Sequence, residues 1–203
     1  MKSIVHKAGS FVAHMLRAKH INRWPLMNSL NTDSVSAHCY DVAVVAHRIA
    51  VYAQLNGKDV SPEAVATAAV FHEASEPGGF GDLPGPFKRA TEALFKEIKA
   101  LERTVEESMV DSLDEASRPY YDKYVVQAKV EPEIKKIVKA ADEICALLKA
   151  LGELNLGNNE YKIAAANQRI TVDKWCEELP EAKLFVDNDL KFCMMTLDEL
   201  IGN

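Results

Sequence analysis

Residues 68–76 read Ala-Ala-Val-Phe-His-Glu-Ala-Ser-Glu, so a histidine and two acids follow directly on an apolar run. The upstream segment Ser61-Pro62-Glu63 predicts a helix start, because serine caps helices, proline suits the first position and an acid suits the first turn. We therefore expect a helix over residues 61–76. Burying a carboxylate without a partner is costly, so His72-Glu73 indicates a functional site within this otherwise apolar helix.

Two more potential metal ligands lie in segments that are predicted to be buried helices. His38 follows Val-Ser-Ala and precedes Cys-Tyr, and Asp142 lies between apolar residues of a long helical segment. Together with His72 and Glu73 they provide two imidazoles and two carboxylates. This set suits a divalent ion such as Mn²⁺, Fe²⁺, Co²⁺ or Zn²⁺, and metal binding would offset the cost of burying the carboxylates.

Each of these residues taken singly has a simpler explanation. A lone histidine on an apolar helix is commonly a core residue, and Asp142 could be a surface acid paired with Lys139 or Lys149. The order of the ligands along the chain, all on predicted helices, favours a shared metal. Glu76 strengthens this interpretation, since it follows the histidine by four residues and the glutamate by three, on the same helix face. A second carboxylate there suits a general acid or base.

The rest of the chain predicts an all-α bundle, because no segment shows the period-two alternation of a strand. Residues 77–86 are rich in glycine and proline and are predicted to form a non-helical loop directly after the acidic cluster. No linker divides the chain, so we expect one domain over residues 1–203. The other predicted helices span residues 5–18, 35–55, 87–110, 114–125, 131–155, 160–178 and 189–200.

Composition narrows the class of protein. The net charge is −6, which argues against a nucleic-acid polymer as partner. No stretch is apolar for long enough to span a membrane, and the first residues do not resemble a signal peptide. The cysteines form no CxxC pair, so we expect free thiols in a reducing cytoplasm. They are Cys39, Cys145, Cys176 and Cys193.

The ligand order resembles the H…HD…D pattern of the HD superfamily, and several segments resemble a narrower family. From about residue 11 to residue 161 the chain is similar to the bacterial 5′-deoxynucleotidases of the YfbR type. The similar segments are Ile21-Asn22-Arg23-Trp24-Pro25-Leu26, Val35-Ser36-Ala37-His38, His72-Glu73-Ala74-Ser75-Glu76, Gly81-Asp82-Leu83-Pro84, Lys139-Ala140-Ala141-Asp142 and Leu156-Gly157-Asn158-Asn159-Glu160.

This resemblance implies an HD-domain helical bundle with one divalent metal ion, namely Co²⁺, Mn²⁺, Fe²⁺ or Zn²⁺. The ligands would be His38, His72, Glu73 and Asp142, which fall on the metal positions of the family. The resemblance also implies a homodimer. The partner would be a small-molecule deoxynucleotide, and the activity would be metal-dependent removal of its 5′-phosphate.

The resemblance assigns further roles residue by residue. Glu76 falls on the catalytic glutamate and Arg23 on the contact to the 5′-phosphate. Trp24 falls where an indole leaves no room for a ribose 2′-hydroxyl, and Asp82 falls where the family meets the deoxyribose hydroxyl. Without the resemblance, Arg23 would be interpreted as a surface residue and Trp24 as a core anchor. Lys88 follows the loop and would add positive charge to the substrate pocket.

Two positions depart from the family pattern. Glu73 stands where the family has aspartate, and its extra methylene moves the carboxylate against metal–oxygen distances that tolerate only about 0.2 Å. The change could alter metal preference, slow the reaction or abolish metal binding. Ala37 stands where an acidic residue usually precedes the histidine, which would loosen the support of the metal ligand.

We expect the metal to act as a Lewis acid and to activate a water that attacks phosphorus, while Arg23 neutralises the phosphate charge and Glu76 relays protons. Two alternatives remain open at this point. One is a deoxynucleoside triphosphohydrolase. The other is a degenerate HD protein that binds nucleotide without turnover, because Glu73 replaces the usual aspartate.

Overall fold

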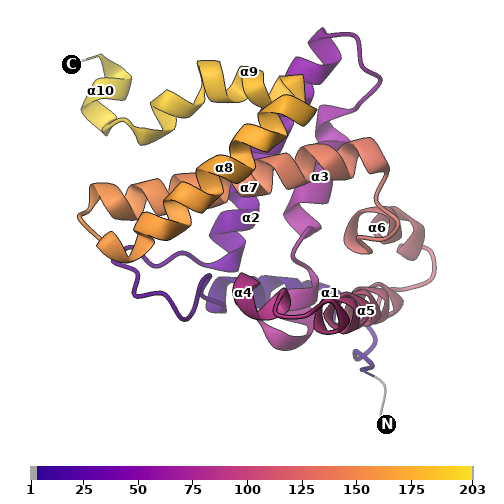
Figure 1. The fold of residues 1–203 in the computed structure, drawn as a ribbon. Coiled ribbons are helices and arrows are strands. Elements are labelled where there is room, and N and C mark those ends of the chain that lie inside the picture. The colour runs from indigo at the N-terminus through magenta and orange to yellow at the C-terminus, as the bar shows by residue number, and fades with distance from the viewer. Residues whose placement is uncertain (1–3, 203) are drawn as a thin grey trace. The chain divides into compact units, whose positions relative to one another are not determined.

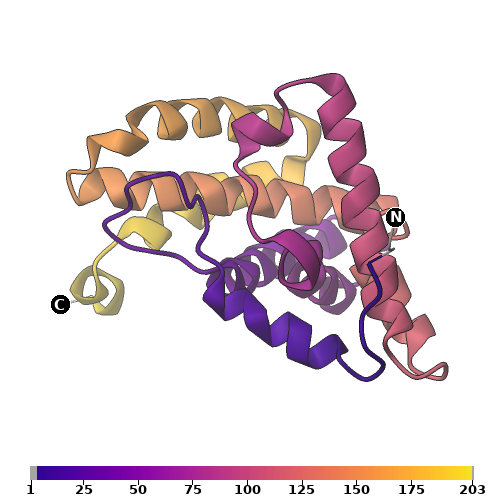
Figure 2. The ribbon, with the colours of Figure 1, turned by 90° about the horizontal axis from the view of Figure 1, so that it is seen from below.

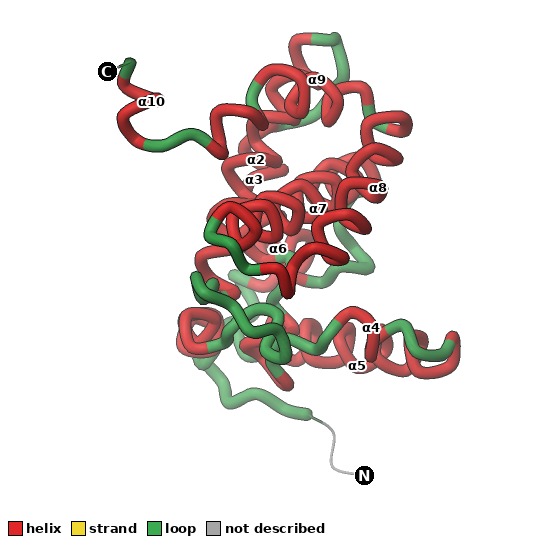
Figure 3. Tube along the Cα trace, turned by 60° about the vertical axis from the view of Figure 1, so that its left-hand side comes forward, coloured by secondary structure: helices red, strands yellow, loops and turns green. Residues whose placement is uncertain are grey.

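Figure 1 shows the computed structural model, which describes residues 4–202. Helices and loops make up these residues (Figure 3). One isolated antiparallel bridge joins Asn22 and Ser34. The all-α prediction is confirmed. None of the helices in residues 4–202 has the length and apolar character to cross a membrane. The α-helices are α1 (Phe11–Met15), α2 (Val35–Leu55), α3 (Pro62–Phe71), α4 (Gly85–Lys88), α5 (Glu92–Asp111), α6 (Arg118–Val125), α7 (Pro132–Asn155), α8 (Lys162–Glu178), α9 (Pro180–Asn188) and α10 (Leu197–Ile201).

The chain divides into two compact units. The first comprises residues up to 28, residues 32–40 and residues 67–132, and the second comprises residues 29–31, residues 41–66 and the chain from 133 onward. The prediction of a single domain over residues 1–203 stays a prediction.

The first unit is built around the long helix α5. Thr91 caps this helix by accepting a hydrogen bond from the backbone N–H of Leu94, so α5 begins after the cap, at residue 92. Helix α6 lies beside α5 (Figure 1). The buried face of α5 forms an apolar core with residues from α1 and α6. The buried members of this core are Phe11, Ala74, Val105, Met109, Val110, Val125 and Val126.

In the second unit, α7 and α8 form a helical hairpin (Figure 2). Residues 156–161 reverse the chain between them, and the amide of Gln168 on α8 donates to the backbone carbonyl of Glu143 on α7. Helix α9 packs against α8. Ile144 and Leu147 on α7 and Val172 on α8 are fully buried, so apolar packing holds the hairpin together.

A buried carboxylate fixes one loop of the second unit. Glu153 on α7 accepts hydrogen bonds from the backbone N–H groups of Leu30 and Asn31, both at 2.9 Å. The Lys149 ammonium and the Asn158 amide also donate to it, at 2.9 and 2.7 Å. Burial alone would raise the pKa of Glu153, but these donors outweigh it and lower the pKa to about 2. The carboxylate therefore stays charged and holds residues 30 and 31.

Several element boundaries differ from the predictions. The first predicted helix is shorter, because only Phe11–Met15 is α-helical and a 3-10 turn (Leu16–His20) follows it. Helix α9, at Pro180–Asn188, was not predicted. The predicted helix over residues 87–110 divides into α4 and α5. The prediction that residues 77–86 are non-helical was wrong, since they hold most of a π-helical turn, η2 (Glu76–Phe80), and the start of α4.

The π-helical turn η2 packs directly on α5, and this close approach requires glycine at residue 78. A Cβ on Gly78 would lie 2.2 Å from the Met109 Sδ and 2.7 Å from the Val105 Cγ1, which leaves no room for a side chain. Gly81 follows the turn with a φ of +74°, a conformation that glycine adopts without strain. Close packing thus keeps this segment helical, although its glycine and proline content predicts a loop.

Candidate metal centre

The two histidines of the predicted ligand set lie next to each other. His38 is buried in the first turns of α2, where its backbone N–H bonds to the carbonyl of Ser34 at 3.0 Å. The imidazole rings of His38 and His72 have their centroids 5.2 Å apart, with 59° between the ring planes. Histidines on separate elements are therefore brought together in the interior of the protein.

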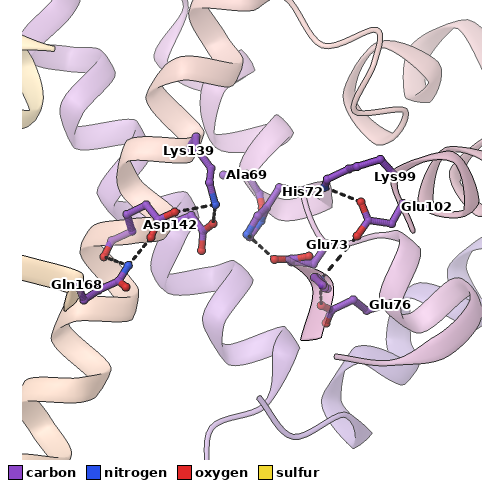
Figure 4. A network of polar contacts seen from close by, with 11 residues as sticks. Ala69, His72, Glu73, Glu76, Lys99, Glu102, Lys139, Asp142 and Gln168 are labelled. Carbon is purple, nitrogen blue, oxygen red and sulfur yellow. Dashed lines mark hydrogen bonds and ion pairs between the residues drawn. The ribbon is translucent and has the colours of Figure 1, made fainter. Parts of the chain in front are cut away.

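His72 and Glu73 lie in a turn that follows α3, which ends at Phe71. The prediction that they lie within the helix was wrong, because the helix ends at Phe71 and not at residue 76. His72 Nδ1 lies 2.6 Å from the backbone carbonyl of Ala69 (Figure 4). A carbonyl only accepts hydrogen bonds, so Nδ1 carries the proton and Nε2 presents its lone pair.

The free lone pair of His72 Nε2 has the character of a metal ligand. This atom is buried and has no hydrogen-bond partner among residues 4–202. The Glu73 Oε1 atom lies 3.7 Å from it. Metal-bound histidines typically fix their ring by donating the other N–H to a backbone carbonyl, as His72 does to Ala69. A divalent cation would satisfy the buried Nε2 atom.

Asp142 lies on α7 and is buried apart from a small exposed part of its carboxylate. The Lys139 ammonium lies 2.6 Å from its Oδ2 atom and 3.0 Å from Glu143 Oε1 (Figure 4). The simpler explanation of Asp142 as the partner of Lys139 therefore describes part of its surroundings. It does not account for the whole group, because one donor atom from each of His38, His72, Glu73 and Asp142 lies within 4.8 Å of the others.

The chemistry of this donor set fits a divalent cation. Neutral imidazole nitrogen and carboxylate oxygen bind borderline metals such as Zn²⁺, Mn²⁺, Fe²⁺ and Co²⁺. The longer side chain of Glu73 still places a carboxylate oxygen within the group. All four donors therefore lie together although glutamate replaces the aspartate of the family pattern.

Glu76 is the first residue of the π-helical turn η2 and is buried, with 4% of its surface exposed. Burial raises its pKa to about 9, and the negative charges of Glu73 and Asp82 act in the same direction. The positive charges of Lys88 and Arg23 partly oppose this rise. A carboxyl group in this environment can hold a proton at neutral pH, as a general acid must.

Glu102 on α5 is a buried acid at this site that the sequence interpretation missed. The Lys88 ammonium lies 3.6 Å from Glu102 Oε1 and 3.9 Å from Glu76 Oε1, and the Lys99 ammonium lies 2.6 Å from Glu102 Oε2 (Figure 4). Glu102 falls between Ile98 and the buried apolar positions that follow it at helical spacing. An acid within an apolar stripe was the signal that could have identified it.

Arg23 and Trp24 lie at the start of a loop whose base is closed by backbone pairing. The Arg23 N–H donates to the Asp33 carbonyl, and the Val35 N–H donates to the Ile21 carbonyl, both at 2.9 Å. The Arg23 guanidinium, which is largely buried, lies 3.7 Å from the Asp33 carboxylate. Beyond this pairing, the backbone N–H of Trp24 donates to the Asp82 carboxylate at 2.6 Å.

A sequence profile of the YfbR-like 5′-deoxynucleotidases matches residues 10–193. The chain belongs to this family. The 5′-deoxynucleotidase of Vibrio cholerae is 38% identical over 191 residues, which cover 94% of this chain and 97% of that protein. The Escherichia coli 5′-deoxynucleotidase YfbR is 36% identical over 195 residues, which cover 96% of each. The predicted resemblance to YfbR-type proteins is confirmed.

Solved structures confirm the HD-domain fold. An HD-domain phosphohydrolase from Listeria innocua has a TM-score of 0.78 and 21% identity, covering 96% of this chain and 92% of that one. The HD phosphohydrolase DatZ of cyanophage S-2L has a TM-score of 0.63 and 18% identity, covering 89% of this chain and 96% of that one. DatZ was solved with dA and one catalytic Zn²⁺ ion. The YfbR-like chain thus shares its architecture with distant HD phosphohydrolases.

Proposed function

We propose that this protein removes the 5′-phosphate from deoxyribonucleoside 5′-monophosphates and releases a deoxynucleoside and inorganic phosphate. The observation that supports this most directly is the group of four donor atoms within 4.8 Å in a chain of the YfbR-like family. Relatives named 5′-deoxynucleotidases match nearly the whole chain.

In this proposal His38, His72, Glu73 and Asp142 hold one divalent metal ion, which is Co²⁺, Mn²⁺, Fe²⁺ or Zn²⁺. The bound ion would supply Lewis acidity toward the phosphate and lower the pKa of water. The hydrogen bond from His72 to Ala69 keeps the imidazole in the tautomer that leaves Nε2 available as a ligand.

Arg23 and Lys88 provide positive charge for the phosphate. The guanidinium has five N–H donors and suits the oxygens of a phosphate, and its Nη1 atom lies 3.7 Å from the Asp33 carboxylate. The Lys88 ammonium lies between the carboxylates of Glu76 and Glu102, which keep its positive charge beside Glu76. These groups would neutralise charge that develops on the phosphate oxygens.

Glu76 would transfer the proton that the departing 5′-oxygen needs, because it is buried and lies near the charges of the ligand Glu73 and of Asp82, Lys88 and Arg23. Trp24 would exclude ribonucleotides by leaving no space for a 2′-hydroxyl, and Asp82 would accept a hydrogen bond from the deoxyribose hydroxyl. Ribose carries the same hydroxyl, so this hydrogen bond would orient the sugar, and the exclusion of ribonucleotides would rest on Trp24.

A panel of deoxynucleoside and ribonucleoside 5′-monophosphates, assayed for phosphate release with Mn²⁺, Co²⁺ and Zn²⁺ in turn, tests the proposal. We expect turnover of several deoxynucleotides and little of ribonucleotides. The Trp24→Ala variant should let ribonucleotides compete, and Glu76→Ala should lower turnover while the protein retains its metal. A protein that holds no metal and has no activity with any of these ions would instead be a degenerate binder.

Identifying the released group separates the proposal from a deoxynucleoside triphosphohydrolase, which would release triphosphate from a deoxynucleoside triphosphate. We also propose a homodimer, which rests on the family resemblance. Light scattering on the purified protein tests the oligomeric state, and a monomeric mass would contradict it.

A further inference from the structure

We infer that Asp82 is a positioning residue for Trp24: its carboxylate holds the Trp24 backbone in a left-handed conformation and so fixes where the indole stands. The effect on sugar selection rests on the proposed function, because it assumes that Trp24 faces the sugar. The effect on Trp24 itself rests only on contacts within the protein.

The first observation is the backbone of Trp24. Its φ is +52°, and it is the non-glycine residue with a positive φ among residues 4–202. A bulky side chain rarely adopts this conformation, because its Cβ atom approaches its own backbone. Pro25 follows and restricts the preceding residue further. Such a conformation persists only where surrounding contacts impose it, so the contacts of Trp24 must supply that constraint.

The second observation is a contact that constrains the Trp24 backbone. The Trp24 N–H donates to Asp82 Oδ2 at 2.6 Å, across 58 residues of sequence. Backbone pairing closes the loop up to Arg23, whose N–H donates to the Asp33 carbonyl. Trp24 is the next residue, and its N–H turns away to Asp82 instead. A charged acceptor makes this hydrogen bond stronger than one between neutral groups.

The third observation is where Asp82 comes from. It follows Gly81, which terminates the π-helical turn that begins with Glu76. The turn packs against α5 at Gly78, and this packing holds in place the end of the turn, which Asp82 follows. The same short segment therefore carries Glu76 and the anchor of Trp24. This places the proposed sugar reader and the proposed proton donor in one fixed geometry.

Asp82 could act through its hydrogen bond to the Trp24 N–H or through its negative charge near Glu76, and substitutions separate these two effects. Asparagine keeps one acceptor oxygen and can still bind the Trp24 N–H, whereas alanine cannot. Loss of the Asp82 charge also changes the electrostatic surroundings of Glu76. That change affects deoxynucleotides and ribonucleotides alike, so the ratio of their kcat/KM values isolates the effect on sugar selection.

The spectroscopic test uses the protein without nucleotide. The chain has two tryptophans, so Trp175→Phe leaves Trp24 as the sole indole. In this background, we expect Asp82→Ala to shift the Trp24 emission to longer wavelength and to speed its quenching by acrylamide. Asp82→Asn should keep both close to the parent values. Glu92→Ala, which removes an exposed acid paired with Lys96, is the matched control and should change neither.

The kinetic test compares a deoxynucleotide with the corresponding ribonucleotide. We expect Asp82→Ala to reduce the preference for the deoxynucleotide at least about tenfold, and Asp82→Asn to retain most of it. Unchanged emission and quenching in Asp82→Ala, or an Asp82→Asn protein with a displaced indole, would overturn the inference. Should the protein hydrolyse no monophosphate, the proposed function fails, while the fluorescence comparison still decides whether Asp82 positions Trp24.

Discussion

The Lys88 ammonium lies 3.6 Å from the carboxylate of Glu102, a buried acid in the apolar face of α5. The same ammonium lies 3.9 Å from Glu76 Oε1. Glu102 therefore holds a positive charge beside the proposed proton donor. Lys99, on the exposed side, binds the other oxygen of Glu102 and keeps its carboxylate oriented.

Replacing Glu102 by glutamine should lower kcat by about tenfold, because Lys88 loses one of its two acidic partners and no longer stays beside Glu76. In a Lys88→Met background the same replacement should have little further effect, since the two residues act through one contact. Steady-state kinetics of the two single variants and the double variant check this. Glu107→Gln, an exposed acid paired with Arg103 on the same helix, is the control. Additive effects of the two substitutions would contradict the arrangement.

Shortening Glu73 to aspartate should weaken metal binding by about tenfold, because the glutamate already places an oxygen within the donor group and aspartate withdraws it by about 1.5 Å. Isothermal titration calorimetry of the metal-free protein with Mn²⁺ or Co²⁺ measures the metal affinity independently of turnover. His72→Ala should lose the metal altogether. A tighter site and a large gain in rate for Glu73→Asp would mean that the native glutamate handicaps the enzyme.

Glu153 should make folding stability depend on acid pH. Its pKa is about 2 in the folded protein, against an ordinary value of 4.5, so the unfolded chain takes up a proton first as pH falls. The stabilisation is complete above about pH 5 and is lost between about pH 4.5 and pH 2. Glu153→Gln should lower the free energy of unfolding at pH 7 by about 3 kcal/mol, and the difference should shrink through that window. Urea unfolding at several pH values measures it, with Glu160→Gln as an exposed control. A difference that is constant with pH would show that the carboxylate charge is not responsible.

Gly78→Ala should destabilise the protein by about 1–3 kcal/mol, because the new Cβ would lie 2.2 Å from the Met109 Sδ. It should also lower activity by displacing η2, which begins with Glu76. Gly152→Ala is the matched control, since a Cβ there meets nothing within 4 Å and alanine favours the interior of α7 by about 1 kcal/mol. Thermal unfolding of both variants tests the prediction, and a Gly78→Ala protein as stable as Gly152→Ala would refute it.

Local sequence signals determined most of the helices. Polar, turn-like residues at 31–34 and Asn56-Gly57 after Leu55 placed α2 correctly, and proline at residue 132 marked the start of α7. They failed at residues 77–80, where glycine and proline predict a loop. There, close packing against Met109 and Val105 on α5 makes a π-helical turn the structure that fits. Contacts between distant segments override local propensity at that point.

The amino-acid sequence by itself determined the helical class, the family and the order of the ligands His38, His72, Glu73 and Asp142, because periodicity and motif order are properties of the chain alone. Tertiary structure decided the rest. It brought Glu102 to Lys88 and tied Trp24 to Asp82. These contacts join residues whose spacing carries no signal, since only the packed helices decide which buried polar groups meet.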